Sequence, residues 1–548
     1  MSTTQHSNEP VDVVVIGSGV GGAITSMILA EKGLKVVCLE QGDWVDDHPH
    51  GDPGWEYRRF TDWALFPNER HRDSDYPLDT RDEKSLMWNG VGGSTNLYTA
   101  TWPRFRPSDF RKGTEHGLAP DWPIAYEDLA EFYDRSDVDC GVGGFLGDPS
   151  MPQRGPFQTA PCPRGDMSRH AARGFDELGW HWWPMPTAII AEDYRDRNGC
   201  NNCGYCLASC PTGALAGMHV THWPRALAAG AELRTNARVA RIETDADGKA
   251  TGATYIDRST GERRFQAAKV VVLAGNGVGT PRVLLMSDSA AHPNGLANSS
   301  DQVGRNLMHH VLAFVEMWLD APTENHMGTV GATLISAEFA ETDVSRGFVN
   351  GTTLHLVRQL GAGIQALGSN SGNRAPWGRG HHDWFRRHFS HGLSVLVYGD
   401  DLPQAENRVT LSDALKDSSG LPGAKIDYKL CANDRRLIEF GIERAKDLGR
   451  ALGAFEVKTN DFRDADGNYA PNAWHLYGTA RMGDDPNTSV VNPWHQAWDC
   501  PNLFVIDGSV MVTGAAVNPT STIAALSYRA AENLAARFED ACEGRSFL

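Results

Sequence analysis

The chain has 548 residues, too many for one ordinary domain, and we expect two intimately joined domains. Its 41% apolar and 22% charged residues are globular values that allow a large core. The net charge of −18 argues against nucleic acid or an anionic membrane surface as a partner, and solubility is its simplest interpretation. No stretch approaches the roughly 20 apolar residues that a membrane span needs.

The first ten residues are polar and lead directly into a strand, so no secretory signal is visible. We therefore expect a cytoplasmic protein. Export on a partner's signal would leave no trace in this sequence.

A glycine-rich turn follows the first predicted strand, with the pattern Gly17-x-Gly19-x-x-Gly22. Gly17 allows the tight turn, Gly19 lets a pyrophosphate approach the backbone, and Gly22 lets the next helix pack on the strand. The second predicted strand, residues 35–39, ends in Glu40, at the spacing needed to hydrogen-bond a ribose hydroxyl. These features predict a dinucleotide site at a helix N-terminus.

The next segments of the chain are less regular. Residues 42–81 lack sustained periodicity, which predicts irregular surface segments. Residues 88–98 combine glycines with small polar side chains, which favours a backbone that approaches something closely. The stretch could be a simple turn, but beside a dinucleotide fold we expect it to wrap the cofactor.

In the middle of the chain, the pattern of apolar residues predicts both strands and helices. Residues 269–275 predict a buried strand, and Pro281 suits the first turn of the helix that follows. Short alternating segments between about residues 312 and 424 predict an antiparallel sheet. Residues 433–452 predict an amphipathic helix.

The C-terminal part predicts one more buried strand and one long helix. The strand, residues 504–506, ends at Asp507 and Gly508. Asn518 precedes Pro519, and this pair is typical of a capped helix start.

A basic, histidine-rich and aromatic-rich segment covers residues 374–391. It is interpreted either as a mobile surface loop or as a lid over a pocket.

Four of the ten cysteines are crowded into eleven residues, with the spacing of bacterial ferredoxins: Cys200, Cys203, Cys206 and Cys210. A chain of this size favours a metal or redox loop over a disulfide scaffold. The alternative is a loop that keeps its thiols without metal or oxidises to disulfides.

Several motifs occur in an order that resembles the glucose–methanol–choline (GMC) oxidoreductases. They are the opening Rossmann turn, Gly90-Val91-Gly92-Gly93-Ser94, Val303-Gly304-Arg305-Asn306-Leu307-Met308, His475-x-x-Gly478-Thr479 and Asn518-Pro519-Thr520. Within that family the chain is most similar to bacterial FAD-dependent sugar dehydrogenases, and it also resembles pyranose and glycoside oxidases. The resemblance implies an α/β fold: a Rossmann-like FAD-binding domain and an α+β substrate domain built on an antiparallel sheet.

The resemblance also implies the cofactor site. Gly17, Gly19 and Gly22 would hold the FAD pyrophosphate, and Glu40 the adenosine ribose. Gly93 and Asn96 would line the pyrophosphate and flavin, Val239 the adenine, and Asp507 with Gly508 and Asn518 the ribityl chain and pyrimidine edge. Pyranose oxidases attach FAD through a histidine at the position of Asn96, so we expect non-covalent FAD here.

Two residues match the family's catalytic positions. Oxidising an alcohol removes a proton from oxygen and a hydride from carbon, and a neutral imidazole is a suitable base near pH 7. His475 is the expected base, and the amide of Asn518 could hydrogen-bond the substrate oxygen. A structural role is expected for His309, His310, His381, His382 and His495.

In the sugar dehydrogenases that this chain resembles, a three-iron cluster is bound at positions matching Cys200, Cys206 and Cys210. A 3Fe-4S cluster would fit, and Cys203 could stay outside it or add a ligand to a 4Fe-4S cluster. Such a cluster would pass electrons to an acceptor protein or a small subunit.

The domains expected are residues 1–311 for FAD binding, with the cysteine-rich loop at 198–215, residues 312–465 for the substrate, and residues 466–548 returning to the FAD domain. The function expected is oxidation of a CH–OH group of a sugar or glycoside. An oxygen-using oxidase, a long-chain or sterol alcohol dehydrogenase, a non-redox lyase and a pure electron-transfer subunit are the alternatives.

Overall fold

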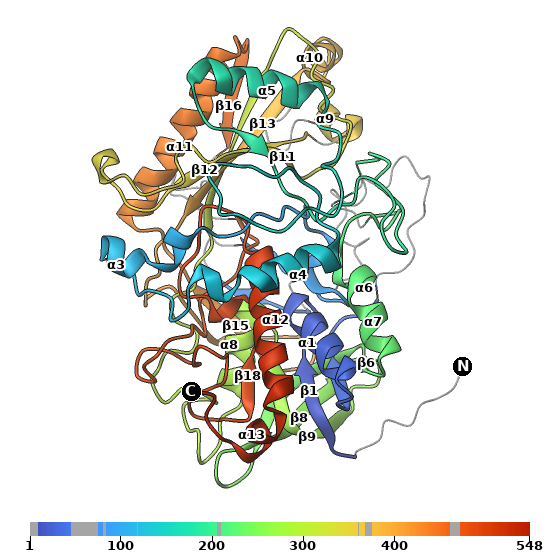
Figure 1. Ribbon diagram of the computed structural model, residues 1–548, viewed down its shortest axis with the longest axis vertical. Coiled ribbons are helices and arrows are strands. Elements are labelled where there is room, and N and C mark those ends of the chain that lie inside the picture. The colour runs from blue at the N-terminus through green and yellow to red at the C-terminus, as the bar shows by residue number, and fades with distance from the viewer. Residues whose placement is uncertain are drawn as a thin grey trace.

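The chain folds into two large parts, each built around a sheet, as the computed structural model shows (Figure 1). The structure describes residues 9–44, 75–80, 84–117, 119–204, 206, 210–359, 361–367, 375–460 and 472–548. Among these, no helix is long and apolar enough to cross a membrane.

The first sheet has seven described strands and contains the predicted dinucleotide turn. Its order is β6 (Glu232–Arg234), β2 (Val36–Leu39), β1 (Val11–Ile16), β9 (Arg263–Leu273), β8 (Ala250–Asp257) and β7 (Ala237–Thr244), with β18 (Leu503–Val505) pairing the second half of β9. The neighbours β6, β2, β1, β9 and β18 run parallel, whereas β7 and β8 add an antiparallel edge.

Helices cover one face of the parallel strands, and the opposite face is also buried, as hydrophobic runs require. α1 (Val20–Glu31) and α12 (Thr520–Ala536) lie side by side on one face, next to α4 (Ala130–Cys140) and α7 (Trp223–Ala228) (Figure 1). In β1, Val13 and Val15 belong to the core under these helices, whereas Val14 and Ile16 belong to the core of the opposite face. This alternation explains why β1 is apolar at successive positions.

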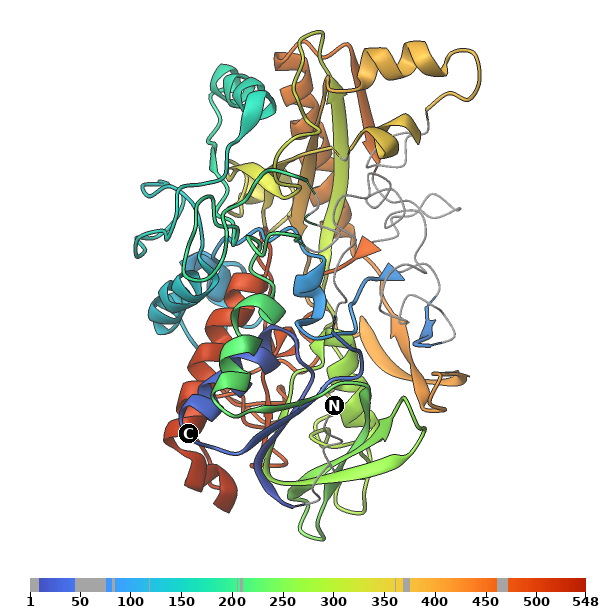
Figure 2. The ribbon, with the colours of Figure 1, turned by 90° about the vertical axis from the view of Figure 1, so that its right-hand side faces the viewer.

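The second sheet is wholly antiparallel. Its order is β16 (Glu456–Asn460), β10 (His310–Trp318), β13 (Gly392–Asp400), β12 (Thr352–Val357), β11 (Ala332–Ser336) and β5 (Trp183–Pro184). The long helix α11 (Ala432–Ala451) packs on β10, β12 and β13, and α5 (Gly165–Leu178) packs on α11 (Figure 2).

Smaller elements complete the described structure. Short strands are β14 (Arg408–Lys416), β15 (Pro422–Asp427) and β3 (Leu78–Asp79) in one sheet, and β17 (Asn472–Ala473) with β4 (Lys84–Ser85) in another. The remaining helices are α3 (Lys112–His116), α6 (Met218–Thr221), α8 (Asn276–Met286), α9 (Ala362–Leu367), α10 (His381–His388) and α13 (Phe538–Glu543). Single 3₁₀ turns are η3 (Gly93–Asn96), η4 (Pro107–Phe110), η5 (Tyr126–Asp128), η7 (Val344–Arg346) and η8 (Gly508–Val510).

The predicted fold class is confirmed, and two helix starts differ from the prediction. Pro281 lies inside α8, which begins at Asn276, and the side chain of Asn276 accepts from Val278 N in the first turn. The carbonyl that Pro281 leaves unpaired, Gly277 O, accepts instead from the hydroxyl of Thr479 at 2.8 Å. A side-chain bond from another part of the chain thus compensates for a proline inside the helix.

The last long helix also starts differently. α12 begins at Thr520 after Pro519, and its start has no side-chain cap. The amide of Asn518 bonds elsewhere, as described below, so this residue does not serve as the predicted helix cap.

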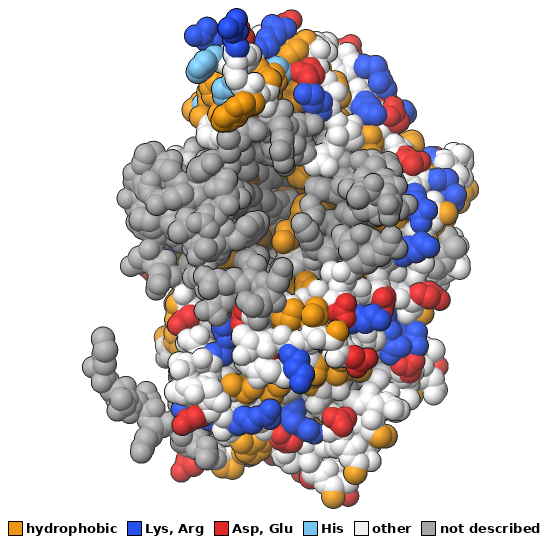
Figure 3. Space-filling model, turned by 180° about the vertical axis from the view of Figure 1, so that it is seen from behind, with side chains coloured by type: hydrophobic (Ala, Val, Ile, Leu, Met, Phe, Trp, Pro, Cys, Tyr) orange, Lys and Arg blue, Asp and Glu red, His pale blue; other side chains and the backbone are white. Residues whose placement is uncertain are grey.

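The histidine-rich segment contains the helix α10, at the end of the molecule farthest from α13 (Figure 1). Basic and histidine side chains gather at this end of the surface (Figure 3). The lid interpretation stays a prediction, and residue 374 lies outside the described residues.

Candidate active site

The glycine turn forms a close-packed cradle at the start of α1. Gly17 has a φ of +98°, and a Cβ there would lie 2.4 Å from Ala274 O. A Cβ on Gly22 would lie 1.8 Å from Gly17 O, so helix and strand meet without side chains. Gly19 faces Gly93 of the second glycine-rich stretch, where a Cβ on Gly93 would lie 2.8 Å from Gly19 Cα. The first backbone N–H groups of α1, which lack helical partners, open beside this contact.

Glu40 lies beside the turn, at the end of β2, as the sequence predicts. Its carboxylate accepts from Ser18 N at 3.0 Å, from the Ser18 hydroxyl at 2.6 Å and from Gly42 N at 2.9 Å. These donors hold the carboxylate in place, and its remaining lone pairs can accept from a ribose. Ser18 is therefore a residue of this site that the motif did not single out.

Two asparagines of the second glycine-rich stretch carry buried polar atoms. Asn96 Nδ2 donates to Val91 O at 2.9 Å and to Gly93 O at 2.8 Å, which holds the turn. Within the described structure, Asn96 Oδ1 and both amide atoms of Asn89 are buried without a hydrogen-bond partner. Such atoms are costly unless a ligand pairs with them, so they fit a bound cofactor.

Asp507 is committed to the chain itself. Its carboxylate accepts from Ser509 N at 2.7 Å, Asn276 N at 2.9 Å and the Thr280 hydroxyl at 2.6 Å, and its burial raises its pKa. It thereby joins the end of β18 to the start of α8. Gly508 opens η8 directly after it.

Val239 lies in β7, where it pairs with Tyr255, and it is buried. Its role beside the adenine stays a prediction.

His475 is half-buried and lies beside a second imidazole. Its Nδ1 is 2.9 Å from Nδ1 of His310, the first residue of β10. The His309 ring bonds through Nδ1 to the carbonyl of His475 at 3.0 Å. His309 and His310, expected to be structural, thus lie against the predicted base.

Asn518 is linked to the surroundings of His475 through Tyr398. The Asn518 amide donates from Nδ2 to the Tyr398 hydroxyl at 3.0 Å, and the Tyr398 ring lies 6.0 Å from the His475 ring. Asn518 is only 6% exposed, and its Oδ1 has no partner among the described residues. An unpaired acceptor therefore remains in the site for a donor such as an alcohol hydroxyl.

The histidines around this point are held neutral. Burial, and after it the rings of His310, His309 and His355, keeps the pKa of His475 well below its usual range. Burial lowers the pKa of His310 to about 4 and that of His355 to about 3. An imidazole that is neutral at pH 7 has a lone pair ready to accept a proton.

The cysteine-rich segment has a neighbour that the sequence did not reveal. The free thiol of Cys162, which precedes the segment by almost forty residues, hydrogen-bonds to Cys200, and this is the main reason that the Cys200 pKa falls to about 6. Burial raises the pKa of Cys206 to about 12, and its sulfur accepts from Val330 N at 3.5 Å. Cys203 is exposed.

The described residues contain no group of three or more His, Cys, Asp or Glu side chains arranged to hold a metal ion. The set Cys200, Cys206 and Cys210 therefore gains no support as an iron–sulfur site.

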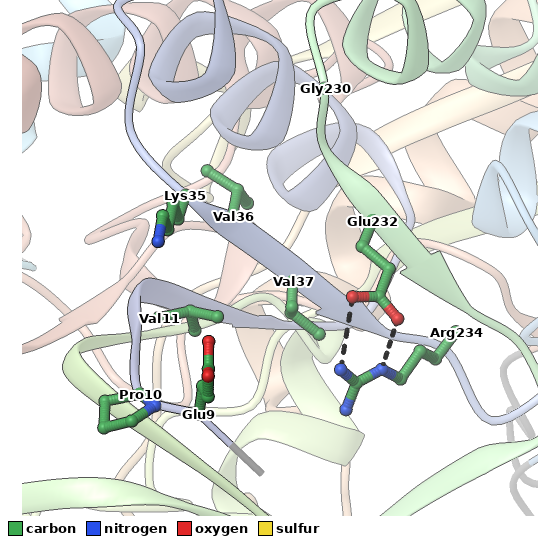
Figure 4. A pocket seen from close by; sticks show the side chains of 9 residues that line it. All are labelled: Glu9, Pro10, Val11, Lys35, Val36, Val37, Gly230, Glu232 and Arg234. Atoms are coloured by element: carbon green, nitrogen blue, oxygen red, sulfur yellow. Dashed lines mark hydrogen bonds and ion pairs between the residues drawn. The ribbon is translucent and has the colours of Figure 1, made fainter. Parts of the chain in front are cut away.

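A separate cavity of about 240 Å³ lies at the opposite edge of the first sheet (Figure 4). Its lining comes from the amino ends of β1, β2 and β6 and includes Lys35 and the ion pair between Glu232 and Arg234. Ligands of parallel sheets bind at the carboxyl ends of the strands, so this cavity is not the dinucleotide site.

The two-sheet architecture and the glycine cradle are those of a dinucleotide-dependent oxidoreductase. The N-terminal GMC oxidoreductase family model matches residues 11–312 and the C-terminal one matches residues 403–527. The chain therefore belongs to the GMC oxidoreductases, which confirms the resemblance found in the sequence. Membership makes it an FAD oxidoreductase acting on CH–OH groups of alcohols.

Relatives along the whole chain have related activities. The chain is 48% identical to the 2-methyl-1,2-propanediol dehydrogenase of Mycolicibacterium austroafricanum, with 98% of each covered. It is 30% identical to the fructose dehydrogenase large subunit of Gluconobacter japonicus, covering 96% of this chain and 98% of the relative. The paromamine 6'-oxidase of Streptomyces fradiae is 28% identical over 97% of this chain and 92% of the relative.

Solved structures agree on the fold. Pyridoxine 4-oxidase from Mesorbium loti superposes with a TM-score of 0.64 at 17% identity, covering 95% of this chain and 98% of that chain. A formate oxidase from Aspergillus oryzae gives a TM-score of 0.63 at 15% identity, covering 97% and 99%.

Proposed function

We propose that this protein is an FAD-dependent dehydrogenase that oxidises a CH–OH group next to a second hydroxyl, as sugars, glycosides and small vicinal diols present it. The observation that carries the proposal is the pairing of a neutral His475 with Asn518, whose buried carbonyl oxygen is unpaired. Asn518 suits a substrate with more than one hydroxyl because its amide offers both an acceptor and a second N–H.

FAD, when bound, supplies the hydride acceptor. Gly19, Gly93 and the amides of Asn89 and Asn96 would hold it, and no histidine stands at position 96 to attach it covalently. FAD should therefore be released into solution when the protein is denatured. Retention of flavin on the denatured chain would contradict this.

The chain's own residues manage the proton and the orientation of the alcohol. The neutral His475 ring takes the hydroxyl proton, which can contribute about 10²- to 10⁴-fold to the rate. Asn518 orients the alcohol through its free carbonyl oxygen, while Tyr398 holds the amide from the other side. His309 and His310 fix the His475 backbone and ring.

One experiment tests both a sugar and a small diol as substrates. Purified protein is mixed without oxygen with a pyranose sugar, with 2-methyl-1,2-propanediol and with a long-chain alcohol, and flavin bleaching is followed. Bleaching by either hydroxylated substrate supports the proposal and identifies the class. Bleaching only by the long-chain alcohol would contradict the vicinal-hydroxyl requirement, and no bleaching by any alcohol would favour a non-redox lyase.

The His475→Ala variant tests the base. Flavin reduction should fall by about 10²-fold or more, while FAD stays bound because His475 is not part of the glycine cradle. Near-normal turnover in this variant would overturn the assignment.

We also propose that the electrons leave to an acceptor other than oxygen, which the two relatives named dehydrogenases support. Peroxide formed in proportion to substrate under air would contradict it. Whether the cysteine segment takes part is tested by iron and acid-labile sulfide per FAD in protein purified without oxygen. Three or four irons per flavin would match the predicted 3Fe-4S or 4Fe-4S cluster, and absence of iron would exclude it.

A further inference from the structure

The ring of His310 contacts both His475 and the backbone of the segment that carries Asn518, and its hydrogen bonds fix where its proton lies. Its Nε2 is 2.7 Å from the carbonyl oxygen of Ala515. A carbonyl can only accept, so Nε2 of His310 carries the hydrogen and donates it.

His310 is also neutral. It is 1% exposed, and its burial, helped by nearby Lys112 and His309, lowers its pKa to about 4 although the hydrogen bonds to the Ala515 and Val517 backbone raise it. A neutral imidazole carries one hydrogen, and that hydrogen is on Nε2, so Nδ1 of His310 holds a lone pair.

The partner of this lone pair is His475. The two Nδ1 atoms are 2.9 Å apart, and the rings meet edge to face at 81°. Because His310 Nδ1 is an acceptor, His475 Nδ1 must be the donor. In neutral His475 the lone pair is then on Nε2.

We propose that His310 is the positioning residue that holds His475 in the tautomer with its hydrogen on Nδ1, so that Nε2 is the atom that takes the substrate proton. This inference rests on the proposed function of His475 as the base. When the alcohol proton moves to Nε2, the Nδ1–H bond to His310 persists. FAD, when bound, would accept the hydride that the carbon loses.

The same ring also anchors the segment that carries Asn518. The carbonyl that accepts from His310 belongs to Ala515, three residues before Asn518, and the next carbonyl, Ala516 O, accepts from the Thr353 hydroxyl. One ring thus sets the tautomer of the base and the position of the amide that orients the alcohol.

Two substitutions of His310 separate this role from simple packing. His310→Phe keeps an aromatic ring but removes both hydrogen bonds. His310→Asn places a carbonyl oxygen near the position of Nδ1, where it can accept from His475. His495→Phe is the matched control, because His495 is an equally buried histidine whose ring bonds only to Val505 O in the described structure.

The measured quantity is the rate constant of flavin reduction by the alcohol across pH, together with FAD content. We expect His310→Phe to lower the plateau rate by about 10²-fold, the lower end of what a general base contributes, with FAD still bound. His310→Asn should recover about tenfold of that loss, and His495→Phe should stay at the wild-type rate.

The results that would contradict the role of His310 differ from those that would contradict the proposed function. A wild-type rate in His310→Phe, or no recovery in His310→Asn, would overturn the role of His310 while leaving His475 as the base. If alcohols fail to bleach the wild-type flavin, the proposed function fails instead.

A second measurement tests the proposal on the wild-type protein and does not depend on whether the His310 variants fold. Nitrogen-15 spectra of histidine-labelled wild-type protein, with His475→Ala for assignment, report which ring nitrogen carries hydrogen. We expect Nδ1 for His475, and a hydrogen on Nε2 of neutral His475 would overturn the proposal.

Discussion

His475 can act as a base only while its ring is neutral, and its surroundings keep it so. Desolvation disfavours the imidazolium, and the nearby rings of His310, His309 and His355 add to the effect. The site therefore contains a cluster of imidazoles. In the proposed mechanism His475 takes the proton, His310 holds its ring and His309 holds its backbone. His355 stacks on Tyr398, with ring centroids 4.1 Å apart.

The lowered pKa of His475 predicts the pH dependence of flavin reduction. The base is active when deprotonated, so a pKa below 6.5 extends its active range to lower pH. The rate should be level from neutral pH down through 6.5 and fall only in more acidic solution. Stopped-flow flavin bleaching at a series of pH values measures this, and a rise centred at or above pH 6.5 would contradict it.

At the scale of elements, two glycines near the start of α1, Gly19 and Gly22, are needed for different physical reasons. A Cβ on Gly22 meets the backbone oxygen of Gly17 at 1.8 Å, whereas a Cβ on Gly19 has only Gly93 Cα near it, at 3.9 Å. Gly19 also has a φ of −70°, which alanine adopts readily. Gly22 is thus required by the protein itself, and Gly19 leaves space for a ligand.

Alanine at these two positions should therefore have different effects. Gly22→Ala should destabilise the fold by about 3 kcal/mol, the upper range for overpacking. Gly19→Ala should leave the apoprotein as stable as wild type but weaken FAD binding by about 10²-fold, since its Cβ fills the cradle. Thermal unfolding and flavin titration measure the two, and equal losses of apoprotein stability would contradict the distinction.

The sequence predicts a structural feature well when neighbouring residues determine it, and poorly when residues far apart in the chain do. The turn at Gly17 and the motif at His475 could be found because neighbouring residues carry the signal. Pro281 inside α8 could not, because the carbonyl of Gly277 that it leaves unpaired accepts from Thr479, more than two hundred residues away. The role of His310 depends on strand pairing that a single sequence does not reveal.

At the scale of the whole molecule, the site is assembled from distant segments of the chain. The cradle comes from residues near 17 and 93, the base from residue 475, its partner from β10 and the amide from residue 518. The predicted roles of the FAD-site and catalytic residues, and the domain boundaries, remain predictions.

Removal of FAD should lower the stability of the folded protein. The buried amides of Asn89 and Asn96 lose the ligand that would pair with them, and binding to the folded state adds about 2.7 kcal/mol when FAD is at a hundred times its Kd. The Tm of the apoprotein should therefore rise with added FAD. A Tm that FAD leaves unchanged would contradict the assigned cradle, and Gly19→Ala is the control expected to respond only weakly.

The pairing of β18 with β9 has a consequence for how the chain is made. Val271 of β9 is the neighbour of Leu503, so more than two hundred residues separate partners in one sheet. During synthesis the nascent chain carries the glycine turn early, yet the edge of β9 stays uncovered until the C-terminal segment emerges. Contacts so far apart in sequence form slowly, and an uncovered strand edge favours association with other chains. The first sheet is therefore complete only after β18 has left the ribosome.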